Sequence, residues 1–357
     1  MSPSVGTGRD LLAAAGVLFP DREGRILVVW VSYQAKHPVE IPGGGWEPPD
    51  GSPRETALRE IAEELGFTPR LAGLACLDWT PDRFRPPVAA FLYWAEPLTE
   101  EQLAGIHLEA DELRGYRFVT PREAGSALPP KLSRRVTACL RAPRGAAPLE
   151  LEDGFAVGHT TEVLAPAPPP PYTGAAALDL PPAERPAPPP PMDRDTYIAT
   201  RPRIRAKARV LVTDADGRVL LVRLRPAPGE IGPYWALPGG SIEADRELPR
   251  AAARREVREE LGWEREPGRL LGLDWQPPGE GDRPVLVYVF DGGRAGPAEF
   301  AAIRLQEEEL LEWALFEPEA AREVLSASSW QRLSACLAVR DAGGPSGPVE
   351  LVRGRPV

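Results

Sequence analysis

Two stretches of the chain carry the same pattern, and together they decide the fold. Residues 237–263 read LPGGSIEADRELPRAAARREVREELGW, and residues 41–67 read IPGGGWEPPDGSPRETALREIAEELGF. They align without a gap at an offset of 196 residues. The agreement continues outside them, where Leu77-Asp78-Trp79 matches Leu273-Asp274-Trp275. The sequence therefore predicts a duplicated unit of about 155 residues, which is a normal length for one domain.

Three glutamates share one face of a predicted helix in the second unit. Glu256, Glu259 and Glu260 stand at positions i, i+3 and i+4, which lie on the same side of an α-helix. Like charges at this spacing repel, at a cost of about a few tenths of a kcal/mol for each pair. A hard divalent cation such as Mg²⁺ removes the repulsion and binds carboxylate oxygens. A solvated acidic face is the alternative, but its repetition behind a Gly-Gly turn in both units favours a cation site.

The repeated stretch resembles the pattern of the Nudix family, G-x(5)-E-x(7)-R-E-U-x-E-E-x-G-U, in which U is a bulky apolar residue. The second unit fits it from Glu247 to Trp263, with Gly240 one residue early. The first unit fits it from Arg59 to Phe67, with Gly45 at the glycine position. The resemblance implies an α/β protein with two Nudix folds in tandem, each a mixed β-sheet sandwiched between α-helices. The two boxes are residues 43–67 and 239–263.

The resemblance also implies roles for the residues of the two boxes. The predicted metal-binding groups of the second unit are Gly240, Glu256, Glu259 and Glu260, and those of the first are Gly44, Glu60, Glu63 and Glu64. Glu256 and Glu60 resemble a metal ligand or the general base. Arg255 and Arg59 resemble the arginine that orients the glutamates, and we expect Arg255 to pair with Glu247. A further carboxylate from a late loop is assigned to Glu309 and Glu112, although loop glutamates are often simply solvated.

The first unit departs from the family pattern at its early glutamate. Gly51 stands there, with Asp50 next to it, so we expect Arg59 to lack its partner and the second unit to be the better catalyst. The helix of the first unit nevertheless begins better, because Ser52-Pro53-Arg54-Glu55 has the pattern of a capping box with proline in the first turn.

Candidate substrate-binding residues lie on the strands that lead into the second box. Arg223 and Arg225 could grip phosphate, although exposed strand arginines without function fit equally well. Trp235 could line a pocket for a base, and packing at the sheet edge is the alternative. Trp79 and Trp275 are predicted to belong to the core.

Strands and helices alternate in each unit. Strands are predicted at Ile26–Tyr33, Val88–Trp94, Val219–Leu224 and Val285–Phe290, and late helices at Leu132–Leu140 and Trp330–Val339. The predicted domains are residues 1–158 and 204–357, with a proline-rich linker at 159–203. Twelve of the 29 residues in 164–192 are proline, which predicts an extended segment without helix or sheet ladders, either a spacer or a docking site for a partner.

Composition narrows the class of function. The net charge of −10 disfavours binding to duplex nucleic acid. The three cysteines form neither a disulfide framework nor a zinc site and fit a cytoplasmic protein. Neither a secretory signal nor an apolar stretch long enough for a membrane span is found.

The function expected from these features is hydrolysis, dependent on Mg²⁺ or alternatively Mn²⁺, of a nucleoside diphosphate linked to another moiety. The second unit is expected to carry most of this activity on a small-molecule nucleotide. Two alternatives stay open: a nucleotide-sensing protein that binds without turnover, and a scaffold organised by the polyproline segment. The two units could also pack as an intramolecular pseudo-dimer.

Overall fold

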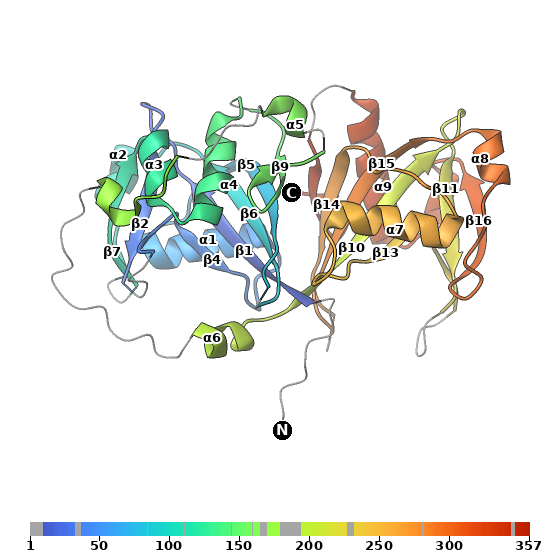
Figure 1. The fold of residues 1–357 in the computed structure, drawn as a ribbon, viewed down its shortest axis with the longest axis horizontal. Coiled ribbons are helices and arrows are strands. Elements are labelled where there is room, and N and C mark those ends of the chain that lie inside the picture. Colours follow the sequence, from blue (N-terminus) through green and yellow to red (C-terminus); the bar gives the residue numbers. More distant parts are fainter. Residues whose placement is uncertain are drawn as a thin grey trace. The chain divides into compact units, whose positions relative to one another are not determined.

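The chain forms two compact units in the computed structural model (Figure 1). Domain 1 comprises Leu12–Arg203, and domain 2 comprises Ile204–Val357 together with the residues up to Leu11. The structure describes residues 10–32, 37–83, 85–109, 112–143, 145–158, 160–164, 170–178, 194–226, 232–279, 282–343 and 347–357.

The first half of the chain contains the following elements in order: β1 (Asp10–Leu18), β2 (Ile26–Val31), β3 (Val39–Glu40), β4 (Gly43–Gly45), α1 (Pro53–Leu65), β5 (Leu71–Thr80), β6 (Val88–Ala95), α2 (Glu100–Ala104), β7 (Leu113–Val119), α3 (Pro121–Ala127), α4 (Pro130–Arg141), β8 (Leu149–Glu152), β9 (Phe155–Ala156), α5 (Thr160–Val163), the 3₁₀ helix η1 (Gly174–Leu178) and α6 (Arg194–Thr200).

The second half repeats most of this order: β10 (Ile204–Thr213), β11 (Val219–Leu224), β12 (Tyr234–Ala236), β13 (Gly239–Ser241), α7 (Pro249–Leu261), β14 (Leu270–Gln276), β15 (Val285–Arg294), α8 (Pro297–Ala301), β16 (Leu310–Phe316), the 3₁₀ helix η2 (Ala320–Glu323), α9 (Ala327–Asp341), β17 (Val349–Val352) and β18 (Arg355–Pro356).

The strands pair in the same way in both domains. In domain 1, β1 runs parallel to β6 and antiparallel to β4, while β5 pairs antiparallel with β6 and parallel with β8. In domain 2, β10, β15, β13, β14 and β17 repeat these pairings. A second set of antiparallel strands places β2 between β3 and β7, and β11 between β12 and β16. The predicted mixed α/β fold, present twice, is confirmed.

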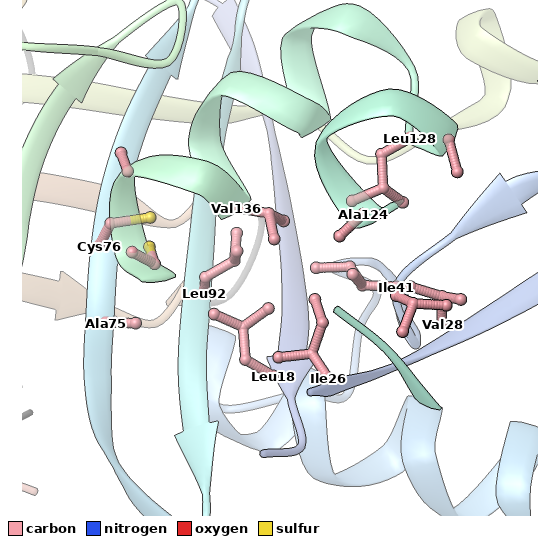
Figure 2. Close-up of a cluster of buried hydrophobic side chains, with 14 of the residues drawn as sticks. Leu18, Ile26, Val28, Ile41, Ala75, Cys76, Leu92, Ala124, Leu128 and Val136 are labelled. Carbon is pink, nitrogen blue, oxygen red and sulfur yellow. The ribbon is translucent and has the colours of Figure 1, made fainter. Parts of the chain in front are cut away.

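Helices cover both faces of each sheet. Successive strand residues point to opposite faces, and in β6 Leu92 packs in the cluster that includes Val136 of α4, as Figure 2 shows. The next residue, Tyr93, lies on the other face, where Arg54 of α1 stacks 5.3 Å from its ring centre. The helix of each box therefore lies on the opposite face of its sheet from the late helix.

Helix α7 ends at Gly262 as the sequence predicts, but only half of the predicted capping box of α1 forms, because the Glu55 carboxylate accepts from the Gly51 amide at 2.8 Å. The hydroxyl of Ser52 accepts a hydrogen bond from Glu55 N at 3.2 Å and Pro53 begins α1, whereas Leu248 before α7 provides no side-chain cap. Both helices end at a glycine in the left-handed region, Gly66 at φ 80° and Gly262 at φ 72°. Only glycine adopts this conformation without strain.

Two predictions about local structure need correction. Strand β2 ends at Val31, and Tyr33 lies outside the described residues. Part of the proline-rich segment folds, because Gly174–Leu178 forms a 3₁₀ helix in a stretch that lacks proline. Leu178, with 1% of its surface exposed, and Leu164 belong to the core of domain 1, so these residues are not a passive spacer. Residues 165–169 and 179–193 lie outside the described residues.

Other buried side chains follow the sequence. Trp79 and Trp275 are 1% and 2% exposed and belong to the core, as predicted. Cys76, Cys139 and Cys336 are buried free thiols. Within the described ranges, no helix has both the length and the apolar character needed to cross a bilayer.

Candidate active site

A glycine turn and the end of a helix meet in each domain. In domain 2 the Gly239 amide donates a hydrogen bond of 2.7 Å to Glu260 Oε2. In domain 1 the Gly43 amide donates one of 2.8 Å to Glu64 Oε2. These bonds attach the last glutamate of each box helix to the turn between strand and helix. The turn and the helix that the sequence pattern links are therefore in direct contact.

The second glycine of each turn leaves room for a glutamate carboxylate. A β-carbon on Gly240 would lie 2.6 Å from Glu256 Cδ, and one on Gly44 would lie 2.5 Å from Glu60 Oε2. Because real β-carbons essentially never come this close to another atom, any larger residue at either position would displace the glutamate carboxylate. The equivalent glycines of the two domains are thus Gly44 and Gly240.

Arg255 organises the glutamates of domain 2. Its guanidinium donates to Glu247 through Nε at 3.0 Å and Nη2 at 2.7 Å, which is the pairing that the sequence predicts. The same group contacts Glu256 Oε1 at 2.9 Å and Glu259 Oε2 at 2.7 Å. It also donates to the Ser241 carbonyl at 3.1 Å. One cation therefore fixes three carboxylates and the turn.

Arg59 does not lack its partner in domain 1, so that expectation is wrong. Asp50 accepts hydrogen bonds from Arg59 Nε and Nη2, both at 3.0 Å to its nearest oxygens. Thr56 also donates to this carboxylate, at 2.8 Å. Arg59 then reaches Glu60 at 3.0 Å and Glu63 at 2.9 Å, as Arg255 does in domain 2. A shorter acidic side chain one residue earlier replaces the glutamate.

Burial raises the pKa of the glutamates that face the turns. Burial is the largest cause in each case, and it raises the pKa of Glu60 to about 7 and those of Glu64 and Glu260 to about 8. It also raises the pKa of Glu256. Burial is also the largest single cause for Asp50, but the hydrogen bonds from Arg59 and Thr56 together with the charge of Arg59 outweigh it and leave the pKa of Asp50 below its usual value. The charged form is therefore disfavoured in the glutamates nearest the glycine turns, whereas Asp50 stays ionised.

The late-loop glutamates lie close enough to act on the boxes. The charge of Glu309 raises the pKa of Glu260, and that of Glu112 raises the pKa of Glu64. Glu40 of β3 acts on Glu64 in the same way. The sequence offered no reason to select Glu40.

Arg209 is a site residue that the sequence analysis missed. It is 6% exposed and donates to the Leu237 carbonyl at 2.9 Å and to the Gly239 carbonyl. Burial lowers its pKa, while the charges of Glu260 and Glu256 oppose that effect. Arg205, Lys207 and Arg209 alternate with apolar residues along β10, so the sequence alone did not distinguish Arg209 from ordinary strand cations.

A cavity of about 310 Å³ lies between the sheet of domain 2 and α9. Its lining includes Trp235, Tyr234, Lys207, Arg209, Gln276 and Ser329. The ring of Trp235 also packs edge-on against Phe316, with 5.0 Å between ring centres. Trp235 thus lines a cavity and also packs at the sheet edge, and its role toward a base stays a prediction.

Arg223 and Arg225, which the sequence suggested as phosphate-binding residues, do not line this cavity. Arg223 pairs with Glu312 at 2.6 Å, and Arg225 donates to the Glu307 carbonyl at 2.7 Å.

Comparison with known proteins identifies the repeated unit. A model of the NUDIX domain matches residues 10–138 and again residues 203–335, which together make up more than half of the chain. The chain belongs to the Nudix family. This confirms the expected hydrolase family and its tandem arrangement. No curated protein matches the chain.

Solved structures of single Nudix proteins also resemble the chain. A MutT protein from Methanosarcina mazei Go1 is 24% identical over 38% of this chain and 93% of its own, with a TM-score of 0.32. The E. coli ORF135 protein is 27% identical over 39% and 94%, with a TM-score of 0.31. An Ap4A hydrolase from C. elegans is 18% identical over 39% and 98%, with a TM-score of 0.31.

The Nudix boxes of this chain have the donor set for a hard cation. Each brings buried carboxylate oxygens against a glycine backbone that carries no side chain. Among the residues described, no group of three or more acidic, histidine or cysteine side chains is already arranged to hold a metal ion. The arginine of each box explains this, because Arg255 and Arg59 now hold Glu256 and Glu60. The residues fit Mg²⁺ provided that these glutamates turn away from their arginines.

Proposed function

We propose that domain 2 hydrolyses the diphosphate linkage of a small-molecule nucleotide in a reaction that depends on Mg²⁺ or Mn²⁺. The burial of Glu256 and Glu260 beside the Gly239-Gly240 turn carries this proposal. Two buried carboxylates next to each other are costly for the fold unless a cation compensates them. Gly240, Glu256, Glu259 and Glu260 would hold the ion.

The residues of the site then divide the chemistry between them. Bound Mg²⁺ supplies neutralisation of the phosphate charge and a lower pKa for a nearby water. Glu256 accepts a proton from the water that attacks phosphorus, and Arg255 keeps the glutamates oriented. The bond between phosphorus and the bridging oxygen breaks. The products are a nucleoside monophosphate and a second phosphorylated compound, or pyrophosphate if the substrate is a triphosphate.

The cavity of domain 2 supports a nucleotide as the substrate. Its volume of about 310 Å³ suits a small molecule. Aromatic side chains at 234 and 235 offer stacking surfaces, while Lys207 and Arg209 offer positive charge. Arg209 also acts electrostatically on Glu260 and Glu256, so this one residue links the cavity lining to the glutamates, which do not themselves line the cavity. An anionic ligand with an aromatic base fits this combination.

The ranking of the two domains now has a different basis. The absence of the early glutamate no longer favours domain 2, because Asp50 pairs with Arg59. The cavity of domain 2, whose lining includes Arg209, supports that domain as the main catalyst. Domain 1 keeps the same arrangement of Glu60, Glu63 and Glu64 around its arginine.

Turnover of a nucleotide panel tests the proposal. The unmutated chain is assayed with Mg²⁺ for release of monophosphate or pyrophosphate from nucleoside triphosphates, nucleotide sugars, ADP-ribose and dinucleoside polyphosphates. We expect Glu260→Gln to lower kcat by roughly 100-fold or more, because it removes a buried ligand of the cation. Glu264→Gln is the matched control, since Glu264 is exposed, lies just after the box and pairs with Arg254.

Three results would separate the alternatives. Absence of turnover that depends on Mg²⁺ across the panel, with nucleotide binding retained, would favour a sensor. Equal losses in Glu64→Gln and Glu260→Gln would contradict the main role of domain 2. A loss in Glu264→Gln as large as that in Glu260→Gln would show that the effect does not belong to the box.

A further inference from the structure

Arg201 lies at the box of domain 1, although it comes from the segment after α6. Its guanidinium forms an ion pair with Glu47, in the loop between β4 and α1. A β-carbon on Gly45 would lie 2.9 Å from Arg201 Cζ. The Arg201 side chain is 15% exposed. A residue about 140 positions from the Nudix helix therefore supplies a cation to its glycine turn.

Comparison with domain 2 indicates that this contact is specific to domain 1. Position 45 corresponds to Ser241 in domain 2. The β-carbon of a serine at position 45 would overlap the place that the Arg201 guanidinium takes in domain 1. Position 47 corresponds to Glu243, whose partner is Arg246 of its own loop at 3.4 Å. Gly45 therefore occurs in the domain in which Arg201 lies against that position.

Each domain has a second arginine near its glutamates, but the two have different origins. In domain 2 it is Arg209 of β10, which pairs with Gly239 as Gly16 pairs with Gly43 in domain 1, so its counterpart is Gly16. In domain 1 it is Arg201, which pairs with Glu47 and lies against Gly45 of the glycine turn. Two unrelated positions therefore provide the same kind of charge to equivalent sites. A requirement of the shared chemistry explains this better than chance packing does.

The chemistry of guanidinium suggests what this charge is for. A planar guanidinium binds phosphate oxygens through two parallel hydrogen bonds. Arg201 pairs with Glu47, and because a guanidinium carries five N–H donors it can bind a phosphate while it keeps that carboxylate. Arg201 is then placed at the turn where the phosphates of a metal-bound nucleotide would lie.

We propose that Arg201 is a substrate-binding residue of domain 1 that holds phosphate oxygens of a diphosphate ligand. This inference rests on the proposed function, because it takes the ligand class from it. The polypeptide between the domains would thereby complete the binding site of domain 1. A simple counter-ion role for Arg201 toward Glu47 and Glu60 is the competing outcome.

Calorimetric binding of imidodiphosphate, an analogue of pyrophosphate that resists hydrolysis, tests this proposal. The full chain carries Glu256→Gln and Glu260→Gln, so that the remaining binding in Mg²⁺ belongs to domain 1. Adding Arg201→Gln should weaken this binding by roughly 10- to 100-fold, and Arg201→Lys should weaken it less. Arg246→Gln is the matched control, because Arg246 pairs with Glu243 on the equivalent loop, and it should change the affinity by less than about twofold.

A second variant protects the test against a folding defect. Gly45→Ser installs the residue of domain 2 and displaces the guanidinium, so it should weaken binding in the same direction while thermal melting stays cooperative. Unchanged imidodiphosphate affinity in Arg201→Gln, with tighter Mg²⁺ binding, would assign a counter-ion role and overturn the proposal. Absence of any binding in domain 1 would also overturn it. The hydrolysis by domain 2 is measured separately in the unmutated chain, so the two failures are distinguishable.

Discussion

Asp50 offers the sharpest test of how domain 1 keeps its box assembled. Its side chain is 6% exposed, accepts hydrogen bonds from Arg59 Nε and Nη2, and is also bound by Thr56. Breaking a buried ion pair by removing one charge costs about 3–5 kcal/mol. Arg59 is 25% exposed and keeps Glu60 and Glu63 as partners, so we expect Asp50→Asn to cost about 2–4 kcal/mol.

Calorimetric melting of the full chain measures this cost. For a unit the size of domain 1, each kcal/mol shifts Tm by roughly 2–4 °C, so Asp50→Asn should lower the transition of domain 1 by roughly 5–15 °C. Glu55→Gln is the control, because Glu55 only accepts an exposed bond from the Gly51 amide at 2.8 Å. A shift for Asp50→Asn no larger than that of the control would refute the role given to Asp50.

A rescue variant strengthens the test. Gly51→Glu in the Asp50→Asn background places a carboxylate at the family position. The atoms nearest to a β-carbon there belong to the Glu55 carboxylate, with both oxygens at 2.9 Å, and they lie at the end of a flexible side chain. The rescue variant should therefore recover at least half of the lost Tm. No recovery would mean that the loop of domain 1 depends on aspartate at position 50.

Three further predictions concern domain 2. Gly240→Ala should abolish measurable Mg²⁺ binding in domain 2, followed by calorimetry, because its β-carbon would displace Glu256; unchanged affinity would contradict the packing argument. Burial raises the pKa of Glu260 from 4.5 to about 8, so its stabilising contribution without metal is complete below pH 4.5 and is lost as the pH rises through 8. Tm in EDTA should therefore fall between pH 6 and 8, and Glu260→Gln should flatten that slope; an equal slope in both proteins would contradict the assignment. Asp274 is fully buried and accepts bonds from Arg332 at 2.6 Å and the Gly354 amide at 2.8 Å, so Asp274→Ala should cost about 3–5 kcal/mol in urea denaturation, whereas a loss below 1 kcal/mol would mean that the pair is not stabilising.

Residues within one turn or one helix were predictable because local periodicity governs them. The spacing of Glu256 and Glu260 fixes the face of the helix on which they lie, and Gly262 ends that helix through its own backbone freedom. Arg255 and Glu247 are eight residues apart, and their pairing also followed from the pattern. The family pattern gave a wrong expectation for Arg59, because it requires the glutamate at position 51. In the structure the carboxylate of the preceding residue, Asp50, reaches Arg59 instead.

The sequence alone determined the duplication, the mixed α/β class, the box helices and the glycine turns, because each depends on residues close together in the chain. The tertiary structure decided which distant residues join the boxes: Arg209 through the pairing of β10 with β13, and Arg201 through the return of the segment after α6 to domain 1. It also created the cavity that Trp235 lines. The physical reason is that burial, and the proximity of charges far apart in sequence, arise only when strands and helices pack.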